Sequence, residues 1–242
     1  MRVQMPDVPL IVLTRPAAQA ERFAQHCARR FGGRIETLIA PVLKIEPLRP
    51  DLEPKPEQSL VFTSENGVLA LGPNPAVKGR TAYCVGPQTA NAARALGMDA
   101  IDAGGAAGDL IARILADMPP GPLLHVRGAH ARGHVAQALK AAGLDTQEVI
   151  AYRQTEQPLS SEAILRLSGS APVILPVFSP RSAKLLAMQV PRLGPGVLPI
   201  SLSAAVAEAL PASPNEPVVV AEPNGEAMLA SIERHLPPES AC

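Results

Sequence analysis

The chain has 242 residues, its 22 Lys and Arg residues are balanced by 22 Asp and Glu residues, and only 2% of its residues are aromatic. This length fits one large domain or two small ones, and zero net charge excludes a broad electrostatic field for nucleic acid. The scarcity of aromatic rings also argues against a base-stacking platform. We therefore expect no nucleic-acid partner, and a ligand held by backbone amides and a few charges.

The cysteines are three in number and widely spaced, at Cys27, Cys84 and Cys242. They form neither a disulfide framework nor a zinc pattern, which indicates a reducing compartment. The first residues lack the apolar core of a signal peptide, and no apolar run reaches the length of a membrane span. We therefore predict a cytoplasmic protein with no metal, no cofactor and no membrane partner.

Taken in chain order, apolar runs alternate with helix-forming segments. Strands are expected at residues 10–14, 34–40, 60–63, 81–85, 123–126, 146–155, 173–178, 197–200 and 218–220. Helices are expected at residues 17–30, from about 64, 86–97, 109–118, 131–143, 160–167, 181–188, 203–210 and 225–235. Residues 41–57 are rich in proline and extended, as in a connector between lobes. Alternating strands and helices predict parallel sheets with helices on both faces.

The segment 60–67, with the sequence LVFTSENG, predicts a buried strand that stops at Phe62 and a helix that starts near Ser64. Such a junction places backbone N–H groups and hydroxyls at the carboxyl end of a strand, where α/β sheets bind ligands and a helix N-terminus favours an anion. The segment 177–183, VFSPRSA, repeats this pattern.

The repeat extends through much of the chain. Phe62 matches Phe178 and Arg15 matches Arg127, and the spacing of such pairs stays between about 111 and 116 residues. A near-constant spacing indicates duplicated strand-helix-strand units, and hence two similar lobes, without revealing how the two halves are wound together.

The residues just past the expected strand ends carry mostly hydroxyl, amide and guanidinium groups. They are Thr14, Arg15, Thr63, Ser64, Asn66, Gly86, Gln88, Thr89, Arg127, Gly128, Ser179, Arg181, Ser201 and Ser203. Such a set suits a ligand rich in carboxylates or phosphates, and offers no carboxylate pair for hydrolysis.

Structural alternatives stand beside these functional ones. Ser64, Thr89 and Ser203 are equally expected as helix caps, and Arg15 and Arg127 as surface ion pairs. Two histidines, His130 and His134, are four residues apart, but no third zinc ligand is apparent, and we expect these two and His125 on the polar surface.

Tyr152 differs from these candidates because it is one of two tyrosines in the chain. It closes the strand expected to run between the halves, and it stands where the other half has Pro41. A phenol there could belong to the core, whereas between two lobes its hydroxyl would face the cleft.

Six segments together resemble the uroporphyrinogen-III synthase family. They are LTRP (13–16), VFTSENGV (61–68), VGPQTA (85–90), VRG (126–128), VIAYR (149–153) and VFSPR (177–181). The resemblance implies two similar parallel-sheet α/β lobes of flavodoxin-like or Rossmann-like fold, joined by a two-stranded β-ladder, with the active site in the cleft. It places residues 1–40 and 155–242 in one lobe and 41–154 in the other, with crossings near 41–47 and 148–154.

The implied reaction cyclises hydroxymethylbilane, a linear tetrapyrrole with eight carboxylates, into uroporphyrinogen III without a cofactor. By this resemblance Tyr152 is the catalytic proton donor. The substrate-binding residues are Arg15, Thr63, Ser64, Asn66, Gly86, Thr89, Arg127, Gly128, Ser179 and Ser203. Family members are monomers, and we expect the same of this chain.

One segment departs from the family pattern. The sequence Ile200-Ser-Leu-Ser-Ala204 replaces the usual Ile-Gly-Pro-Thr-Thr, so that either Ser201 or Ser203 is expected to supply the missing hydroxyl. The alternative function is a non-catalytic, two-lobed cytosolic binding protein for a small polycarboxylate or tetrapyrrole.

Overall fold

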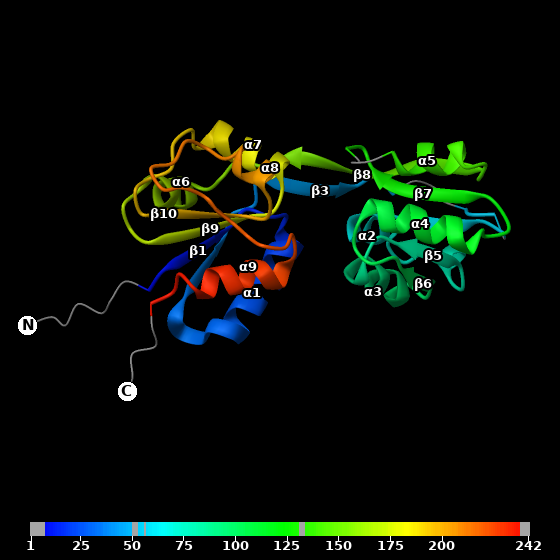
Figure 1. Cartoon of the computed structure of the whole chain (residues 1–242), viewed down its shortest axis with the longest axis horizontal. Coiled ribbons are helices and arrows are strands. Elements are labelled where there is room, and N and C mark those ends of the chain that lie inside the picture. The colour runs from blue at the N-terminus through cyan, green and yellow to red at the C-terminus, as the bar shows by residue number, and fades with distance from the viewer. Residues whose placement is uncertain (1–7, 50–52, 56, 131–133, 238–242) are drawn as a thin grey trace, which may run out of the picture. The chain divides into compact units, whose positions relative to one another are not determined.

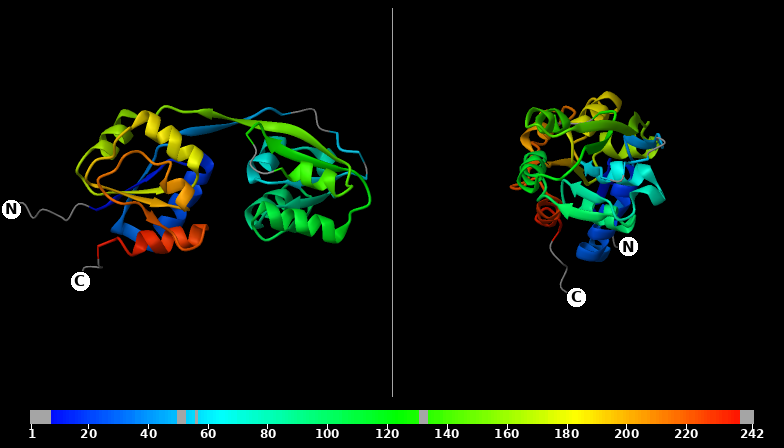
Figure 2. Two further views of the ribbon diagram at one scale, coloured as in Figure 1. Left: turned by 45° about the horizontal axis from the view of Figure 1, so that its top comes forward. Right: turned by 90° about the vertical axis from the view of Figure 1, so that its right-hand side faces the viewer.

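The computed structural model describes residues 8–49, 53–55, 57–130 and 134–237. It divides into two compact units, one formed by the chain up to Lys44 and from Glu156 onward, the other by Ile45–Thr155. The chain passes between the units within β3 (Leu43–Pro47) and β8 (Thr146–Glu156), which are neighbouring strands (Figures 1 and 2). Backbone hydrogen bonds from Leu48 N to Ala151 O at 2.8 Å and from Gln157 N to Val42 O at 2.9 Å show that these strands run antiparallel.

Unit 1 is built on a five-stranded sheet in the order β11-β10-β9-β1-β2, in which every strand pair is parallel. The strands are β1 (Leu10–Leu13), β2 (Glu36–Ile39), β9 (Val173–Val177), β10 (Val197–Ser201) and β11 (Val218–Val219). One face is covered by α1 (Ala17–Phe31) and α9 (Gly225–Glu233), the other by α6 (Ser161–Ser168), α7 (Pro180–Gln189) and α8 (Ala204–Ala207) (Figure 1). Because helices cover both faces, central strands such as β1 are apolar and buried at every position.

Unit 2 contains a six-stranded sheet in the order β3-β8-β7-β4-β5-β6. Its remaining strands are β4 (Ser59–Phe62), β5 (Thr81–Cys84), β6 (Asp99–Asp102) and β7 (Leu123–Gly128). Helices α2 (Glu65–Leu71) and α3 (Pro87–Ala95) pack on one face, and α4 (Ala107–Asp117) and α5 (Val135–Ala141) on the other. The strands from β8 to β6 are parallel to their neighbours, so their carboxyl ends lie at one edge.

The two sheets have the same strand order once the chain order is permuted. Unit 1, numbered from β1 through β2, β9, β10 and β11, has the order 2-1-3-4-5. Unit 2 has this order when it is numbered from β7 through β8, β4, β5 and β6. The duplicated units inferred from the sequence are therefore present, and the second is a circular permutation of the first, inserted between β2 and β9.

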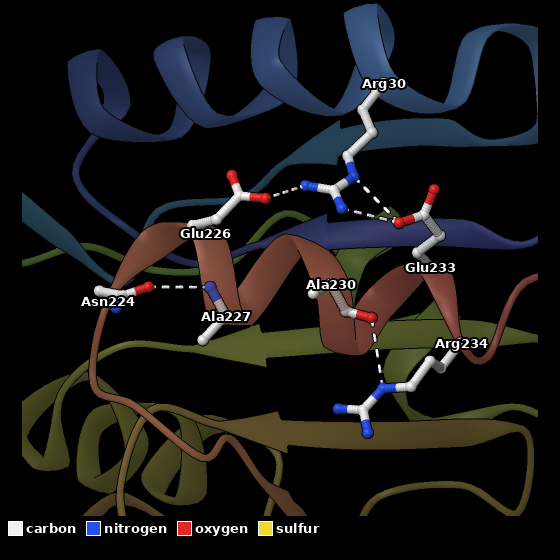
Figure 3. Close-up of polar contacts among 7 residues, drawn as sticks. All are labelled: Arg30, Asn224, Glu226, Ala227, Ala230, Glu233 and Arg234. Atoms are coloured by element: carbon white, nitrogen blue, oxygen red, sulfur yellow. Dashed lines mark hydrogen bonds and ion pairs between the residues drawn. The ribbon is translucent and has the colours of Figure 1, made fainter.

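Helices α1 and α9 lie side by side and are joined by Arg30 (Figure 3). Its guanidinium donates to Glu233 Oε2 from Nε at 3.0 Å and from Nη2 at 2.8 Å, and Nη1 donates to Glu226. Asn224 caps α9 by accepting from Ala227 N at 2.8 Å. Because these groups are exposed to solvent, the ion pairs orient α9 more than they stabilise it.

The predicted α/β class with two lobes is confirmed. Strand β6 was not predicted from the sequence, and the helix expected at 203–210 is shorter, since α8 ends at Ala207. Part of the helix expected at 131–143 lies outside the described residues, and α5 covers the rest of it. Across the parts of the chain that the structure describes, no helix is both long and apolar enough to cross a membrane.

Candidate functional site

The carboxyl ends of β4 and β7 in unit 2 meet where the crossover connections diverge. From β4 the chain crosses to β5 through α2 on one face, and from β7 it crosses to β8 through α5 on the opposite face. At such a switch point the loops part and leave room for a ligand. The sequence-predicted residues Thr63, Ser64 and Gly128 all lie at this point.

Tyr152 packs its ring directly on Gly128. A Cβ atom on Gly128 would lie 2.6 Å from Tyr152 Cζ and 3.0 Å from its hydroxyl oxygen. The register between β7 and β8 shifts here, pairing Arg127 with Ile150 but Gly128 with Tyr152. This irregularity and the missing side chain at Gly128 together place the phenol at the end of β7.

The Tyr152 hydroxyl is hydrogen-bonded by the side chains of Ser64 and Asn66, from the start of α2. Burial raises the pKa of Tyr152 above its ordinary value, and the hydrogen bonds from Ser64 and Asn66 only partly oppose this effect. Only 6% of Tyr152 is exposed. At neutral pH this phenol therefore keeps its proton and can act as a proton donor.

Ser64 performs two tasks. Its backbone is extended, and its Oγ accepts from Asn66 N at 3.2 Å, so that it caps α2 as one sequence interpretation predicted. The same side chain reaches Tyr152. Capping and contact with the phenol are thus compatible, and the cap holds the hydroxyl in place.

Helix α2 lies unusually close to β7. A Cβ atom on Gly67 would lie 2.8 Å from Val126 O, so any larger residue there would push the helix away. Since Ser64 and Asn66 belong to the same first turn, Gly67 sets their height above Gly128 and Tyr152.

A second helix N-terminus, that of α3, is packed beside α2. Gly86 occupies its N-cap position, Pro87 follows, and no side chain caps the helix. Thr89 is buried and is not the cap, contrary to the structural alternative for this residue. The first N–H groups of such a helix have no partners within it and favour an anionic ligand.

Arg127 is already paired. It donates from Nε to Glu148 Oε1 at 2.6 Å and from Nη1 to Gly128 O at 3.0 Å. Arg127 therefore fits the ion-pair interpretation. Its remaining N–H groups are the ones that could contact a ligand.

In unit 1 the equivalent positions are Arg15 and Ser179. The guanidinium carbon of Arg15 lies 4.2 Å from the centre of the Phe178 ring, which holds it over the end of β9. Ser179 caps α7, accepting from Ser182 N at 3.1 Å. The aromatic support of Arg15 by Phe178 was not predicted from the sequence.

Of the two serines in the divergent segment, Ser201 is fully buried in β10. Ser203 is only partly buried and stands at the N-cap of α8, where its side chain makes no capping hydrogen bond. Of these two hydroxyls, that of Ser203 is therefore the more accessible.

His125 was expected on the surface, and that prediction is wrong, because only 2% of it is exposed. It lies on β7, a central strand that is paired with β4 on one side and with β8 on the other. His130 and His134 are exposed, as expected. Within the described ranges, no cluster of three or more His, Cys, Asp or Glu side chains could hold a metal ion.

Comparison with known proteins relates this arrangement to one family. A family model described as uroporphyrinogen-III synthase HemD matches residues 21–230. The structure of uroporphyrinogen-III synthetase from Helicobacter pylori 26695 is similar, with a TM-score of 0.67 and 18% identity over 93% of this chain and 99% of that chain. A mutant uroporphyrinogen III synthase from the extremely thermophilic bacterium Thermus thermophilus has a TM-score of 0.47 and 16% identity, over 93% of this chain and 98% of that chain. No curated protein matches the chain.

The contact between Gly128 and Tyr152 leads to a stability prediction. Gly128→Ala should lower the free energy of unfolding by about 1 to 3 kcal/mol, because the new methyl group must displace the phenol ring. Gly33→Ala is the matched control, since a Cβ at Gly33 meets no atom within 4 Å. Denaturant unfolding of both variants is the measurement, and equal stabilities would contradict the packing described.

Proposed function

The chain belongs to the uroporphyrinogen-III synthase family, and we propose that Tyr152 is the proton donor of its reaction. The enzyme converts the linear tetrapyrrole hydroxymethylbilane into uroporphyrinogen III, with loss of water and inversion of the last pyrrole ring. The observation that carries the proposal is the buried Tyr152 phenol, which packs on Gly128 at the carboxyl edge of a parallel sheet.

The substrate's hydroxyl is a poor leaving group, and a positioned acid makes it a better one. The Tyr152 proton goes to this hydroxyl, the C–O bond breaks, and water departs. The substituted carbon of the last ring attacks the resulting cation and forms the spiro intermediate. The older bond from that carbon to its methylene bridge then breaks, and the bridge rebonds at the free carbon on the other side of the ring nitrogen, which inverts the ring and closes the macrocycle. The ring proton lost on completion of the macrocycle then balances the proton that Tyr152 gave.

Ring closure at the substituted carbon requires the bilane to be folded first, and this is the task of the binding residues. We assign substrate carboxylates to the amides at the start of α3, near Gly86 and Thr89, and to Arg15, Ser179 and Ser203 of unit 1. Arginine and helix-terminal amides are the groups that bind carboxylates best. We further propose that the enzyme is a cytoplasmic monomer that needs no cofactor.

The product isomer tests the function as a whole. Purified protein is mixed with enzymatically generated hydroxymethylbilane, and the type III and type I products are separated. The proposal predicts the type III isomer. Formation of type I alone, at the rate seen without protein, would instead leave a binding protein without catalysis.

Tyr152→Phe tests the assigned acid. Removal of the proton donor should lower kcat about 100-fold or more, with little change in KM, because the ring and its packing remain. Tyr83→Phe is the matched control: Tyr83 is also buried, but its hydroxyl is bonded to Asp117 on the α4 face. If Tyr152→Phe turns over like the control, Tyr152 is not the acid.

Thr89→Ala tests the α3 end of the site. Loss of a hydroxyl that contacts substrate should lower kcat/KM about tenfold without unfolding the protein. Thr146→Ala is the control, because Thr146 is also buried but donates to Leu144 O at 3.1 Å at the opposite end of the sheet. Activity of Thr89→Ala equal to that of wild type would assign Thr89 to packing alone.

A further inference from the structure

A polar chain runs beneath the site, centred on the buried His125. This residue lies in β7, level with Val61 of β4 on one side and Glu148 of β8 on the other. The hydrophobic cluster on this face of the sheet includes Val61 and Leu123 of the strands and Leu139 of α5. A histidine in such surroundings needs a polar partner at each ring nitrogen.

The two ring nitrogens point to different partners. Nε2 lies 3.3 Å from Thr63 Oγ1, and Nδ1 lies 3.5 Å from Glu148 Oε1. The latter distance is longer than a hydrogen bond, so the attraction to Glu148 is electrostatic. The same Glu148 oxygen accepts from Arg127 Nε, and Arg127 donates in turn to Gly128 O. Polar contacts therefore connect Thr63 continuously to Gly128.

The carboxylate decides which nitrogen of His125 carries the proton. Burial lowers the pKa of His125 and outweighs the attraction of Glu148, so the ring is neutral and holds one N–H. A proton on Nδ1 faces the negative Glu148, whereas a bare Nδ1 would direct its lone pair at that carboxylate. The proton is therefore on Nδ1, and Nε2 is an acceptor.

This tautomer fixes the hydroxyl of Thr63. Since Nε2 is an acceptor, Thr63 donates its one proton inward to His125. Thr63 is only partly buried, so its oxygen presents lone pairs at the carboxyl edge of the sheet. A carboxylate has no hydrogen to offer such an oxygen, so a substrate group that contacts Thr63 must itself carry a hydrogen-bond donor.

We propose that His125 is a positioning residue that makes Thr63 a hydrogen-bond acceptor for a pyrrole N–H of the bound tetrapyrrole. The inference rests on the proposed function, because that function supplies a substrate with pyrrole N–H groups. Under this proposal the carboxyl edge of the sheet in unit 2 has two kinds of group. The amides at the start of α3 donate hydrogen bonds to substrate carboxylates, and Thr63 accepts a hydrogen bond from a pyrrole ring nitrogen. An acceptor next to Ser64 then orients a pyrrole ring relative to Tyr152.

The tautomer is measured on the full-length wild-type protein without substrate. Long-range proton–nitrogen NMR correlations of ¹⁵N-histidine-labelled protein distinguish Nδ1–H from Nε2–H, and His125→Asn assigns the signal. The proposal predicts Nδ1–H for His125. Glu148→Gln should raise the share of Nε2–H, whereas Glu46→Gln should not, although it breaks the comparable 2.8 Å pair of Glu46 with Arg153. An Nε2–H tautomer in the wild type overturns the proposal.

Kinetics test the contact with substrate. Thr63→Val keeps the side-chain shape, and it should raise KM about tenfold while kcat changes less than about twofold, as expected for loss of one binding hydrogen bond. Thr63→Ser keeps the hydroxyl and should restore KM. An unchanged KM in a folded Thr63→Val variant overturns the proposed role of Thr63. If the wild type still forms the type III product, the proposed function of the enzyme stands. If the wild-type protein forms no type III product, both the proposed function and the proposed role of Thr63 are contradicted.

Discussion

The contact between the Tyr152 ring and the bare backbone of Gly128 is the constraint on which the site depends. A side chain at Gly128 would occupy the position of the phenol. The register shift between β7 and β8 brings the two residues level, and the close approach of α2 at Gly67 brings Ser64 and Asn66 onto the hydroxyl. Three local irregularities therefore hold one phenol in place, and each is costly to change.

Duplication gave the enzyme two parallel sheets, and the carboxyl edges of the two sheets carry different side chains. Where unit 2 has Tyr152, the matching position of unit 1 is Pro41, which has no proton to give. Where Arg127 of unit 2 is tied to Glu148, the matching Arg15 of unit 1 stacks on Phe178. The two sheet edges therefore carry different groups, and permutation places the phenol on β8, a strand that also connects the units.

Much of the fold could be predicted from the sequence because its strands are short apolar runs and its helices begin at hydroxyl or proline residues. Strand β6 was missed because Asp99 and Asp102 make an edge strand look like a loop. The packing of Tyr152 on Gly128 depends on a register shift, and register cannot be obtained from apolar patterning alone. His125 was misplaced because its partners, Thr63 and Glu148, come from strands far apart in the sequence.

The ionisation of Tyr152 tests the central claim most directly. In the Tyr83→Phe variant Tyr152 is the one remaining tyrosine, so the phenolate signal of ¹³C-labelled tyrosine reports on it alone. Because burial holds its folded pKa above the ordinary 10.0, the phenol should stay protonated as the pH passes 10.0, while the unfolded chain ionises. The contribution of Tyr152 to stability is then fully present below pH 10.0 and is lost as the pH rises through the folded pKa. Ionisation of the folded protein at or below pH 10.0 would contradict a phenol buried against Gly128.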